Sequence, residues 1–224
     1  MITISNIHKH FEDQEVLHGI SATFEAGKTN LTIGRSGSGK TVLLRCIVGR
    51  LEPTQGQILY DGRDIHKLSK REGTQLRQEM GMLFQGAALF DSMDVLHNVL
   101  FPLEMFSSKT YNEQLRRARF CLDRVGLTGS ENKMPAELSG GMQKRVAIAR
   151  AIALEPRYLF CDEPNSGLDP YRRGSSTASS VTSPTSMASP LLSTPMIWVR
   201  CVVSENRCSL STMAAPNGLV QAIP

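Results

Sequence analysis

The sequence contains no apolar segment long enough to cross a membrane. Within its 224 residues there is no run of about 18 apolar residues, the length that a bilayer-spanning helix needs. The first residues also lack the basic and then apolar pattern of a secretory signal peptide. We therefore expect a cytoplasmic chain that reaches a membrane only through a partner.

Cysteine and excess charge are both scarce. The five cysteines include neither a C-x-x-C pair nor a metal-ligand spacing, which argues against a disulfide or zinc framework and favours a reducing compartment. Lys and Arg number 25 against 21 Asp and Glu, and the basic residues are interspersed. No basic patch therefore points to nucleic acid or to an anionic membrane surface.

Charged residues are absent between Gly174 and Val199, where Ser, Thr and Pro dominate. Such a stretch lacks the apolar periodicity that buries a face, which predicts a disordered, irregular segment. We therefore divide the chain into a folded domain at residues 1–170 and an irregular tail at residues 171–224.

The folded domain alternates short strands with helices, which predicts the α/β class. A mostly helical insert is expected between residues 86 and 150. Apolar runs predict strands at residues 1–4, 20–24, 30–33, 57–60, 80–84 and 158–161, and helical spacing predicts helices at 41–48, 112–125 and 141–153.

A glycine-rich loop joins one predicted strand to the next helix. Residues 34–41 read Gly-Arg-Ser-Gly-Ser-Gly-Lys-Thr, which matches the P-loop pattern in the strand-to-helix context that confirms it. Backbone amides and the helix N-terminus of such a loop bind phosphate. Lys40 would neutralise phosphate charge, and the Thr41 hydroxyl would bind Mg²⁺. An ordinary Gly/Ser turn would not need this strand, spacing, lysine and threonine together.

Two carboxylates, Asp162 and Glu163, follow the apolar run Tyr158–Cys161. The run is typical of a buried parallel strand. A carboxylate at the tip of such a strand beside a P-loop suits a Mg²⁺ ligand, and the next one can polarise the attacking water. We assign Asp162 to the metal and Glu163 to the water. Apolar strands ending in Asp-Glu are common, so this assignment depends on the P-loop.

A serine and two glycines, Ser139, Gly140 and Gly141, open a predicted helix. They can form a second anion site at the helix N-terminus, although an N-cap serine with flexible glycines explains the same residues.

In this order, the motifs resemble the nucleotide-binding subunit of ATP-binding cassette (ABC) transporters. The resemblance covers residues 1–170 and implies a P-loop NTPase with a RecA-like core, an antiparallel β subdomain and the helical insert. It also implies ATP and Mg²⁺ as cofactors, ATP hydrolysis, and an integral membrane permease as partner. The matching segments are Gly34–Thr41, Gln85 after a strand, Leu138–Met142, Tyr158–Glu163 and Ser166–Asp169.

The resemblance implies a homodimer in which each ATP lies between the P-loop of one subunit and residues 139–141 of the other. It places Phe11 under the adenine, Gln85 between Mg²⁺ and the permease contact, and Asp169 in a loop that crosses the dimer. The expected catalytic residues are Glu163, Lys40 and Gln85. The expected cofactor-binding residues are Phe11, Gly34, Arg35, Ser36, Gly37, Ser38, Gly39, Lys40, Thr41, Val42, Ser139, Gly140, Gly141 and Asp169. The expected metal ligands are Thr41, Gln85 and Asp162.

Residues 81–93, 98–103 and 135–146 resemble the ATPases of mammalian-cell-entry (MCE) and maintenance-of-lipid-asymmetry systems, which move lipids in bacteria. This implies lipid transport across the envelope, an MCE-type lipid-binding protein as an indirect partner, and a position on the cytoplasmic face of the inner membrane. The alternative is that Leu89-Phe90 and Val99–Phe101 are generic core residues of the insert.

After Pro170 the resemblance stops. The family continues with another core strand and a histidine that contacts the γ-phosphate, but no histidine follows His97 here. We therefore expect the strand at 158–161 to lack a sheet neighbour, and turnover to be impaired. Read out of frame, the codons of residues 194–199 permit Thr-His-Asp-Met-Gly with the Asp and Gly forced, so a frameshift is one explanation. A natural Ser/Thr-rich tail is the other.

Two other functions stay open. A soluble ABC ATPase of DNA repair or translation would carry long insertions, for which the roughly 50 residues between Gln85 and Leu138 leave no room. A nucleotide-binding module without turnover is supported only by the missing histidine.

Overall fold

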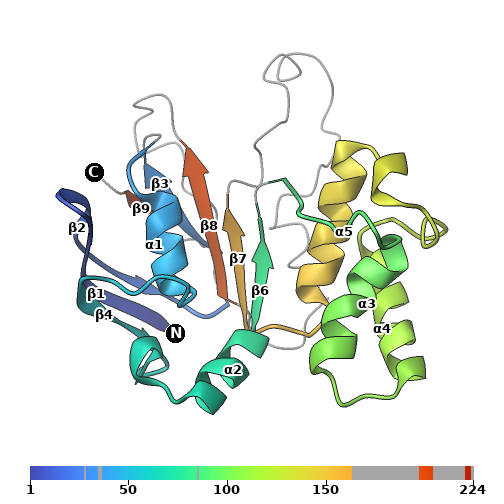
Figure 1. Cartoon of the computed structure of the whole chain (residues 1–224), viewed down its shortest axis with the longest axis horizontal. Coiled ribbons are helices and arrows are strands. Elements are labelled where there is room, and N and C mark those ends of the chain that lie inside the picture. Colours follow the sequence, from blue (N-terminus) through green and yellow to red (C-terminus); the bar gives the residue numbers. More distant parts are fainter. Residues whose placement is uncertain (28, 35–36, 85, 163–196, 204–219, 223–224) are drawn as a thin grey trace.

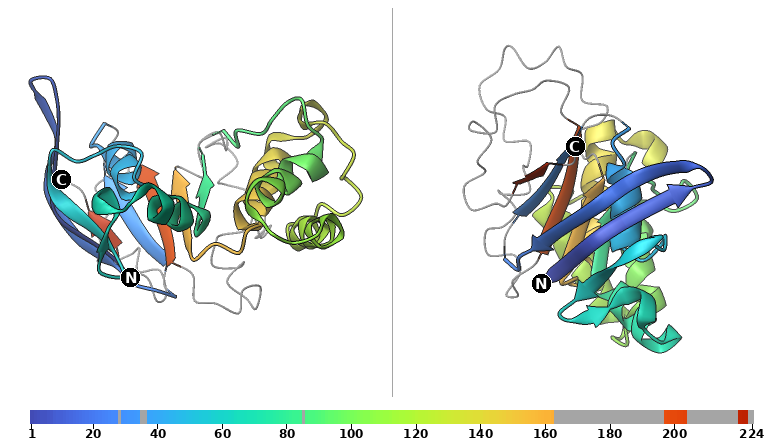
Figure 2. Two further views of the ribbon diagram at one scale, coloured as in Figure 1. Left: turned by 60° about the horizontal axis from the view of Figure 1, so that its bottom comes forward. Right: turned by 90° about the vertical axis from the view of Figure 1, so that its left-hand side faces the viewer.

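In the computed structural model, the described residues are 1–27, 29–34, 37–84, 86–162, 197–203 and 220–222, the last two segments as backbone. They form an antiparallel sheet, a parallel sheet and a group of helices (Figure 1). The left panel of Figure 2 shows these three parts side by side, with the parallel strands in the middle. The predicted α/β class is confirmed.

The antiparallel sheet has the strand order β2-β1-β4-β5. Ile2 of β1 lies opposite Phe24 on one side and Tyr60 on the other, and all three are buried. An Asp61-Gly62 turn follows β4, with both residues in the left-handed region that a two-residue hairpin favours. The strands are β1 (Ile2–Phe11), β2 (Gln14–Phe24), β4 (Gln55–Tyr60) and β5 (Arg63–Asp64).

The parallel sheet has the strand order β6-β7-β8-β3-β9. Because its strands all run in one direction, the carboxyl ends of β3 and β7 lie at the same edge, which is where ligands bind in open α/β sheets. The strands are β3 (Thr29–Gly34), β6 (Met80–Leu83), β7 (Tyr158–Asp162), β8 (Ile197–Val203) and β9 (Val220–Ala222).

Two strands of this sheet come from the segment for which an irregular tail was expected. β8 pairs with β7 on one side and with β3 on the other, and β9 pairs with β3. The expectation that the strand at 158–161 lacks a sheet neighbour is therefore wrong. Residues 197–203 read Ile-Trp-Val-Arg-Cys-Val-Val, a composition typical of strands, and the Ser/Thr-rich average around them concealed it. The rest of residues 171–224 lies outside the described residues.

The helices make up the remaining part of the fold. α1 covers one face of the parallel sheet, and α3, α4 and α5 pack together as the expected helical insert (Figure 1). Their bounds are α1 (Lys40–Ile47), α2 (Lys70–Gln78), α3 (Val95–Phe106), α4 (Tyr111–Arg124) and α5 (Gly140–Ile152), with short 3₁₀ turns η1 (Ile65–Lys67) and η2 (Pro135–Glu137).

Strand β7 joins two hydrophobic cores. Its alternate residues Tyr158 and Phe160 pack into the core formed with α1 and the antiparallel sheet. Leu159 and Cys161 point to the opposite face and pack into the core of the helical insert. The alternation of side chains along a strand thus explains how one short apolar run supports both parts of the domain.

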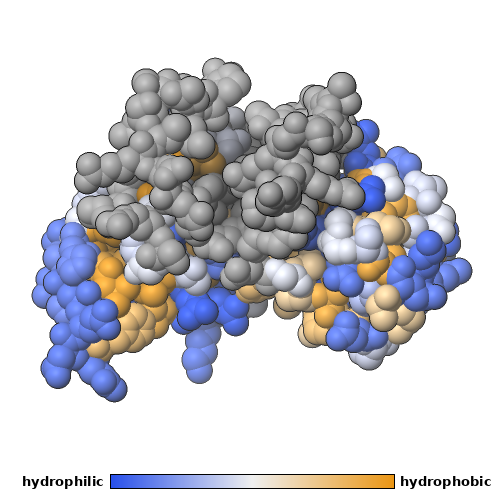
Figure 3. Space-filling model, turned by 90° about the horizontal axis from the view of Figure 1, so that it is seen from above, coloured by the Kyte–Doolittle hydropathy of each residue, from blue (hydrophilic) through white to orange (hydrophobic). Residues whose placement is uncertain are grey.

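The surface mixes hydrophilic and hydrophobic residues. Seen from above, hydrophilic residues occupy the left end, with a band of hydrophobic residues beside them (Figure 3). Among the described residues, no helix combines the length and hydropathy that a membrane span requires.

Candidate nucleotide-binding site

The glycine-rich loop lies between β3, which ends at Gly34, and α1, which begins at Lys40. The predicted strand, loop and helix are therefore confirmed. Gly39 has φ +85°, and a Cβ there would come within 2.8 Å of the Leu17 side chain and 3.0 Å of the Val16 carbonyl oxygen. Only glycine fits this position, because the left-handed backbone and the close neighbours both exclude a side chain.

The start of α1 has features that suit an anion. The helix has no side-chain N-cap and no acidic residue in its first turn, which leaves its first amides available as donors. Gly37 is left-handed, and a Cβ there would meet no atom of the described residues within 4 Å. The Ser38 hydroxyl oxygen is buried and has no hydrogen-bond partner in the described part of the chain. Phosphate oxygens satisfy such donors, so the loop fits a nucleotide phosphate.

Lys40 is almost fully buried at 5% exposure, and its Nζ donates to the Gly34 carbonyl oxygen across 2.9 Å. The side chain therefore bridges the start of α1 and the end of β3. A buried ammonium requires strong hydrogen-bond acceptors, and a phosphate group within the loop would be one. This geometry agrees with the predicted role of Lys40.

Thr41 and Asp162 meet at the common edge of β3 and β7. The Thr41 hydroxyl donates to Asp162 Oδ1 across 3.4 Å. Burial raises the pKa of Asp162, while the Thr41 bond and the charges of Arg45 and Lys40 oppose that rise. A partly buried carboxylate whose charge is incompletely compensated is suited to a cation. Of the three predicted metal ligands, the structure thus brings two together.

Ser139 caps α5, accepting a hydrogen bond from the Met142 amide across 3.3 Å. Gly140 and Gly141 are exposed, and a Cβ at either would have no neighbour within 4 Å. Packing within the described residues therefore does not require glycine here. No hydrogen bond among the described residues joins this segment to the P-loop, and α5 lies on the opposite side of β6 and β7 from α1 (Figure 1).

Phe11 ends β1 and is 44% exposed, with Lys9 Nζ 5.3 Å from its ring centroid. An exposed ring of this kind can stack on a base. Val42 instead packs against the core beneath α1. Five predicted site residues lie outside the described residues: Arg35, Ser36, Gln85, Glu163 and Asp169.

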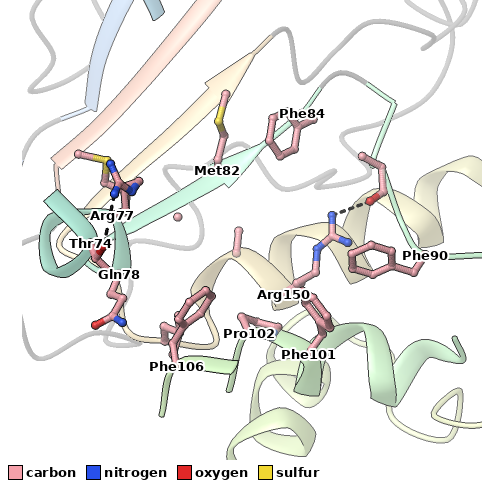
Figure 4. Close-up of a pocket in the computed structure, with 15 residues that line it drawn as sticks. Thr74, Arg77, Gln78, Met82, Phe84, Phe90, Phe101, Pro102, Phe106 and Arg150 are labelled. Carbon is pink, nitrogen blue, oxygen red and sulfur yellow. Dashed lines mark hydrogen bonds between the residues drawn. The ribbon is translucent and has the colours of Figure 1, made fainter. Parts of the chain in front are cut away.

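The sequence interpretation missed a groove between the helical insert and the strand β6. It has a volume of about 410 Å³ and is lined mainly by apolar and aromatic side chains (Figure 4). Phe84, Phe90 and Phe106 line it and are 39%, 40% and 49% exposed. Phe90 is therefore not the generic core residue of the alternative interpretation. Two phenylalanines close to Gln85 in the sequence, Phe84 and Phe90, were the signal that could have predicted this groove.

Comparison with known proteins identifies the domain. The family model described as ABC transporter matches residues 17–166. The probable ribonucleotide transport ATP-binding protein mkl of Mycobacterium tuberculosis is 41% identical over 171 residues, which are 76% of this chain and 48% of that protein. The chain thus spans about half the length of the mkl proteins.

The intermembrane phospholipid transport system ATP-binding protein MlaF of Haemophilus influenzae is 42% identical over 174 residues, 78% of this chain and 66% of that protein. The dimeric bacterial ABC transporter cassette MJ0796 superposes with a TM-score of 0.68 at 32% identity, covering 75% of this chain and 76% of that one. A second structure of the cassette, bound to ADP and Pi, has a TM-score of 0.71 at 26% identity, covering 92% and 88%. The chain belongs to the ABC transporter family and contains its ATP-binding cassette, a P-loop ATPase domain.

Proposed function

We propose that the chain is the ATP-binding and ATP-hydrolysing subunit of an ABC transporter that moves lipids across the bacterial envelope. The observation that carries the ATPase part is the P-loop between β3 and α1, with buried Lys40 inside it and Thr41 bonded to Asp162. Phosphoryl transfer requires such groups: a loop that binds phosphate and two side chains at one sheet edge that could bind a metal ion.

The residues of the loop fit ATP and Mg²⁺. The orphaned Ser38 hydroxyl, the uncapped amides of α1 and Lys40 would hold the phosphates. Thr41 and Asp162, with Gln85, would hold the metal, which when bound neutralises charge on the phosphates. Glu163 directly follows Asp162 in the sequence, and a carboxylate there would accept a proton from the attacking water. Phe11 would stack on the adenine.

The open glycines at the start of α5 support a head-to-tail homodimer. Glycine inside a helix is unfavourable by roughly 1 kcal/mol relative to alanine, and within the part of the chain that the structure describes no neighbour within 4 Å requires it at Gly140 or Gly141. The close approach of a second subunit's nucleotide would explain both residues. Ser139 would donate to that nucleotide, and Asp169 would lie in the contact between subunits.

The groove beside β6 is the proposed contact with an integral membrane permease. Phe84, Phe90 and Phe106 in its lining are exposed, and Phe84 directly precedes Gln85 in the sequence. Exposed aromatic patches mark interaction sites. The subunit would then act on the cytoplasmic face of the inner membrane and would meet an MCE-type lipid-binding protein only through the permease. No nucleic acid is expected as a partner.

The lipid substrate rests on the similarity to MlaF, whose name specifies phospholipid transport, and on residues 81–93. The sequence identity to mkl, which is named for ribonucleotide transport, is nearly the same, at 41% against 42% for MlaF. Reconstitution of the purified transporter in vesicles that contain a fluorescent phospholipid tests this part. ATP-dependent movement of the lipid is the expected result, and its absence while ATP hydrolysis continues would exclude the lipid assignment.

A nucleotide-binding module with impaired turnover is a second candidate, because no histidine follows His97. Loss of one group that stabilises the transferred phosphoryl charge costs about 100-fold in rate. Separate measurements of ATP affinity and phosphate release distinguish the two candidates: tight binding with no release indicates the module. Sequencing the gene tests the frameshift explanation, since a Pro195 codon that ends in any base but C removes the out-of-frame histidine.

A further inference from the structure

The chain leaves β6 through a turn with an unusual backbone. Gly86, Ala87 and Ala88 have φ angles of +86°, +64° and +48°. The Ala88 amide donates to the Gly86 carbonyl oxygen across 2.7 Å, which closes the turn over three residues. Alanine is disfavoured in the left-handed region, because its Cβ crowds the following carbonyl. Two consecutive alanines there persist only where other contacts hold them.

Arg150, in the last turn of α5, supplies those contacts. Its Nη2 donates to the carbonyl oxygens of Ala87 and Ala88 across 3.0 and 2.9 Å. Its guanidinium lies 5.6 Å from the ring centroid of Phe90. Figure 4 shows the two side chains next to each other in the lining of the groove. Among the described residues no carboxylate forms an ion pair with Arg150, and burial lowers the pKa of its guanidinium. The two carbonyls and the ring therefore compensate its charge.

The same helix connects two parts of the proposed ATPase. α5 begins at Ser139-Gly140, the proposed contact with the second subunit's nucleotide, and it carries Arg150 near its other end. The turn that Arg150 holds follows Gln85 directly in the sequence. A helix is a rigid element, so a displacement of its first turn also displaces the guanidinium.

We propose that Arg150 is a positioning residue that holds the left-handed turn at residues 86–88 against α5, and that the turn held in this way supports Mg²⁺ binding through the proposed ligand that precedes it in the sequence, Gln85. The link to Gln85 rests on the proposed function, since Gln85 acts only if the site takes Mg²⁺ and ATP. The planar guanidinium donates to both carbonyls through Nη2 while it also lies near the Phe90 ring, a combination that the compact ammonium of lysine does not reproduce.

Hydrogen exchange of the full-length chain, followed at the amides of Ala88 and Phe90, tests the contact with the turn. In Arg150→Met both amides should exchange at least about tenfold faster than in the wild type, because local opening becomes easier. Arg150→Lys should fall between the two. Adding Ala87→Gly and Ala88→Gly to Arg150→Met should restore much of the protection, since glycine adopts positive φ without strain.

Arg145→Met is the matched control. Arg145 also projects from α5 and donates to two backbone carbonyls, those of Val125 and Gly126, at 3.3 and 3.4 Å. Its loss should leave exchange at residues 88 and 90 unchanged. Equal exchange in the wild type and Arg150→Met, equal acceleration by both Met variants, or failure of the glycine pair to restore protection would each overturn the proposal.

The dependence of ATP affinity on Mg²⁺ tests the link to Gln85. Arg150→Met should lose most of the affinity that Mg²⁺ adds, about tenfold, and keep its affinity for ATP in EDTA within twofold. An equal loss with and without Mg²⁺ would indicate general misfolding and overturn this link. A wild-type chain that binds no ATP would overturn the proposed function, and the exchange experiment would still decide whether Arg150 holds the turn.

Discussion

The hydroxyl of Thr41 donates a hydrogen bond to a carboxylate oxygen of Asp162 across 3.4 Å, although 121 residues separate them in the sequence. Thr41 belongs to the first turn of α1, and Asp162 ends β7. The parallel pairing of β7, β8 and β3 sets both at one sheet edge. The hydrogen bond thus joins two separate sequence motifs, the glycine-rich loop that contains Thr41 and the apolar strand that ends at Asp162, in one candidate site.

Replacing Asp162 with Asn should stabilise the nucleotide-free protein at neutral pH. The pKa of Asp162 is raised in the folded state, chiefly by burial. As the pH rises from the ordinary aspartate pKa through the raised one, the unfolded chain releases a proton that the folded chain still holds. The free energy of unfolding therefore falls across that window, and asparagine removes this loss. Urea unfolding without Mg²⁺ from pH 4 to pH 7 measures it.

The same Asp162→Asn variant should bind Mg²⁺ and ATP more weakly than the wild type, because a neutral amide replaces a charged ligand. A wild-type stability that rises with pH in this window relative to the variant would contradict the burial argument. Unchanged Mg²⁺ dependence of ATP affinity would remove Asp162 from the metal site.

Lys40→Met should lower ATP affinity by about 100-fold, the scale of removing one charge-stabilising donor from such a site. The change also removes the bond to the Gly34 carbonyl oxygen. Titration with a fluorescent ATP analogue measures the affinity. Lys67→Met is the control, since Lys67 is exposed and pairs only with Asp64 among the described residues. The ATP affinity of this variant should equal that of the wild type.

Gly39→Ala and Gly37→Ala separate backbone strain from packing in the P-loop. Both glycines are left-handed, but only at Gly39 does a Cβ meet neighbours, at 2.8 and 3.0 Å. We expect Gly37→Ala to lower the free energy of unfolding by about 1 kcal/mol and Gly39→Ala by about 3 kcal/mol. Denaturant unfolding of the two variants gives the difference. An equal decrease in the free energy of unfolding for the two variants would mean that the Leu17 side chain moves away from the added methyl group without an energetic cost.

Gly141→Ala should affect stability and assembly in opposite directions. An alanine here meets no atom of the described residues within 4 Å, so the helix should gain about 0.5–1 kcal/mol. The added methyl group should nevertheless weaken an ATP-dependent dimer, because it occupies the surface proposed to meet the second nucleotide. Thermal unfolding and sedimentation with ATP, both in the Glu163→Gln background, measure the two effects. Dimerisation as strong as that of Glu163→Gln alone would exclude this surface from the interface.

Sequence patterns predicted the local elements well where the signal was contiguous. The strand, P-loop and helix around residues 30–48 and the helix at 111–124 needed only spacing and propensity. Strands β1 and β2 extend beyond the predicted residues 1–4 and 20–24, because backbone pairing continues where the apolar residues end. β8 was missed because composition averaged over a Ser/Thr-rich stretch hid a seven-residue segment in which six residues are apolar.

The sequence by itself determined which chemistry to expect of this protein, because the predicted phosphate-binding loop, Gly34–Thr41, consists of residues that are adjacent in the chain. Only the tertiary structure decided which distant groups meet. The bond between Thr41 and Asp162 requires the strand order of the parallel sheet. The contact of Arg150 with Ala87 and Ala88 requires α5 to pack beside the turn after β6. Spacing carries no information about such pairs, since long-range packing and strand pairing alone bring them within hydrogen-bond distance.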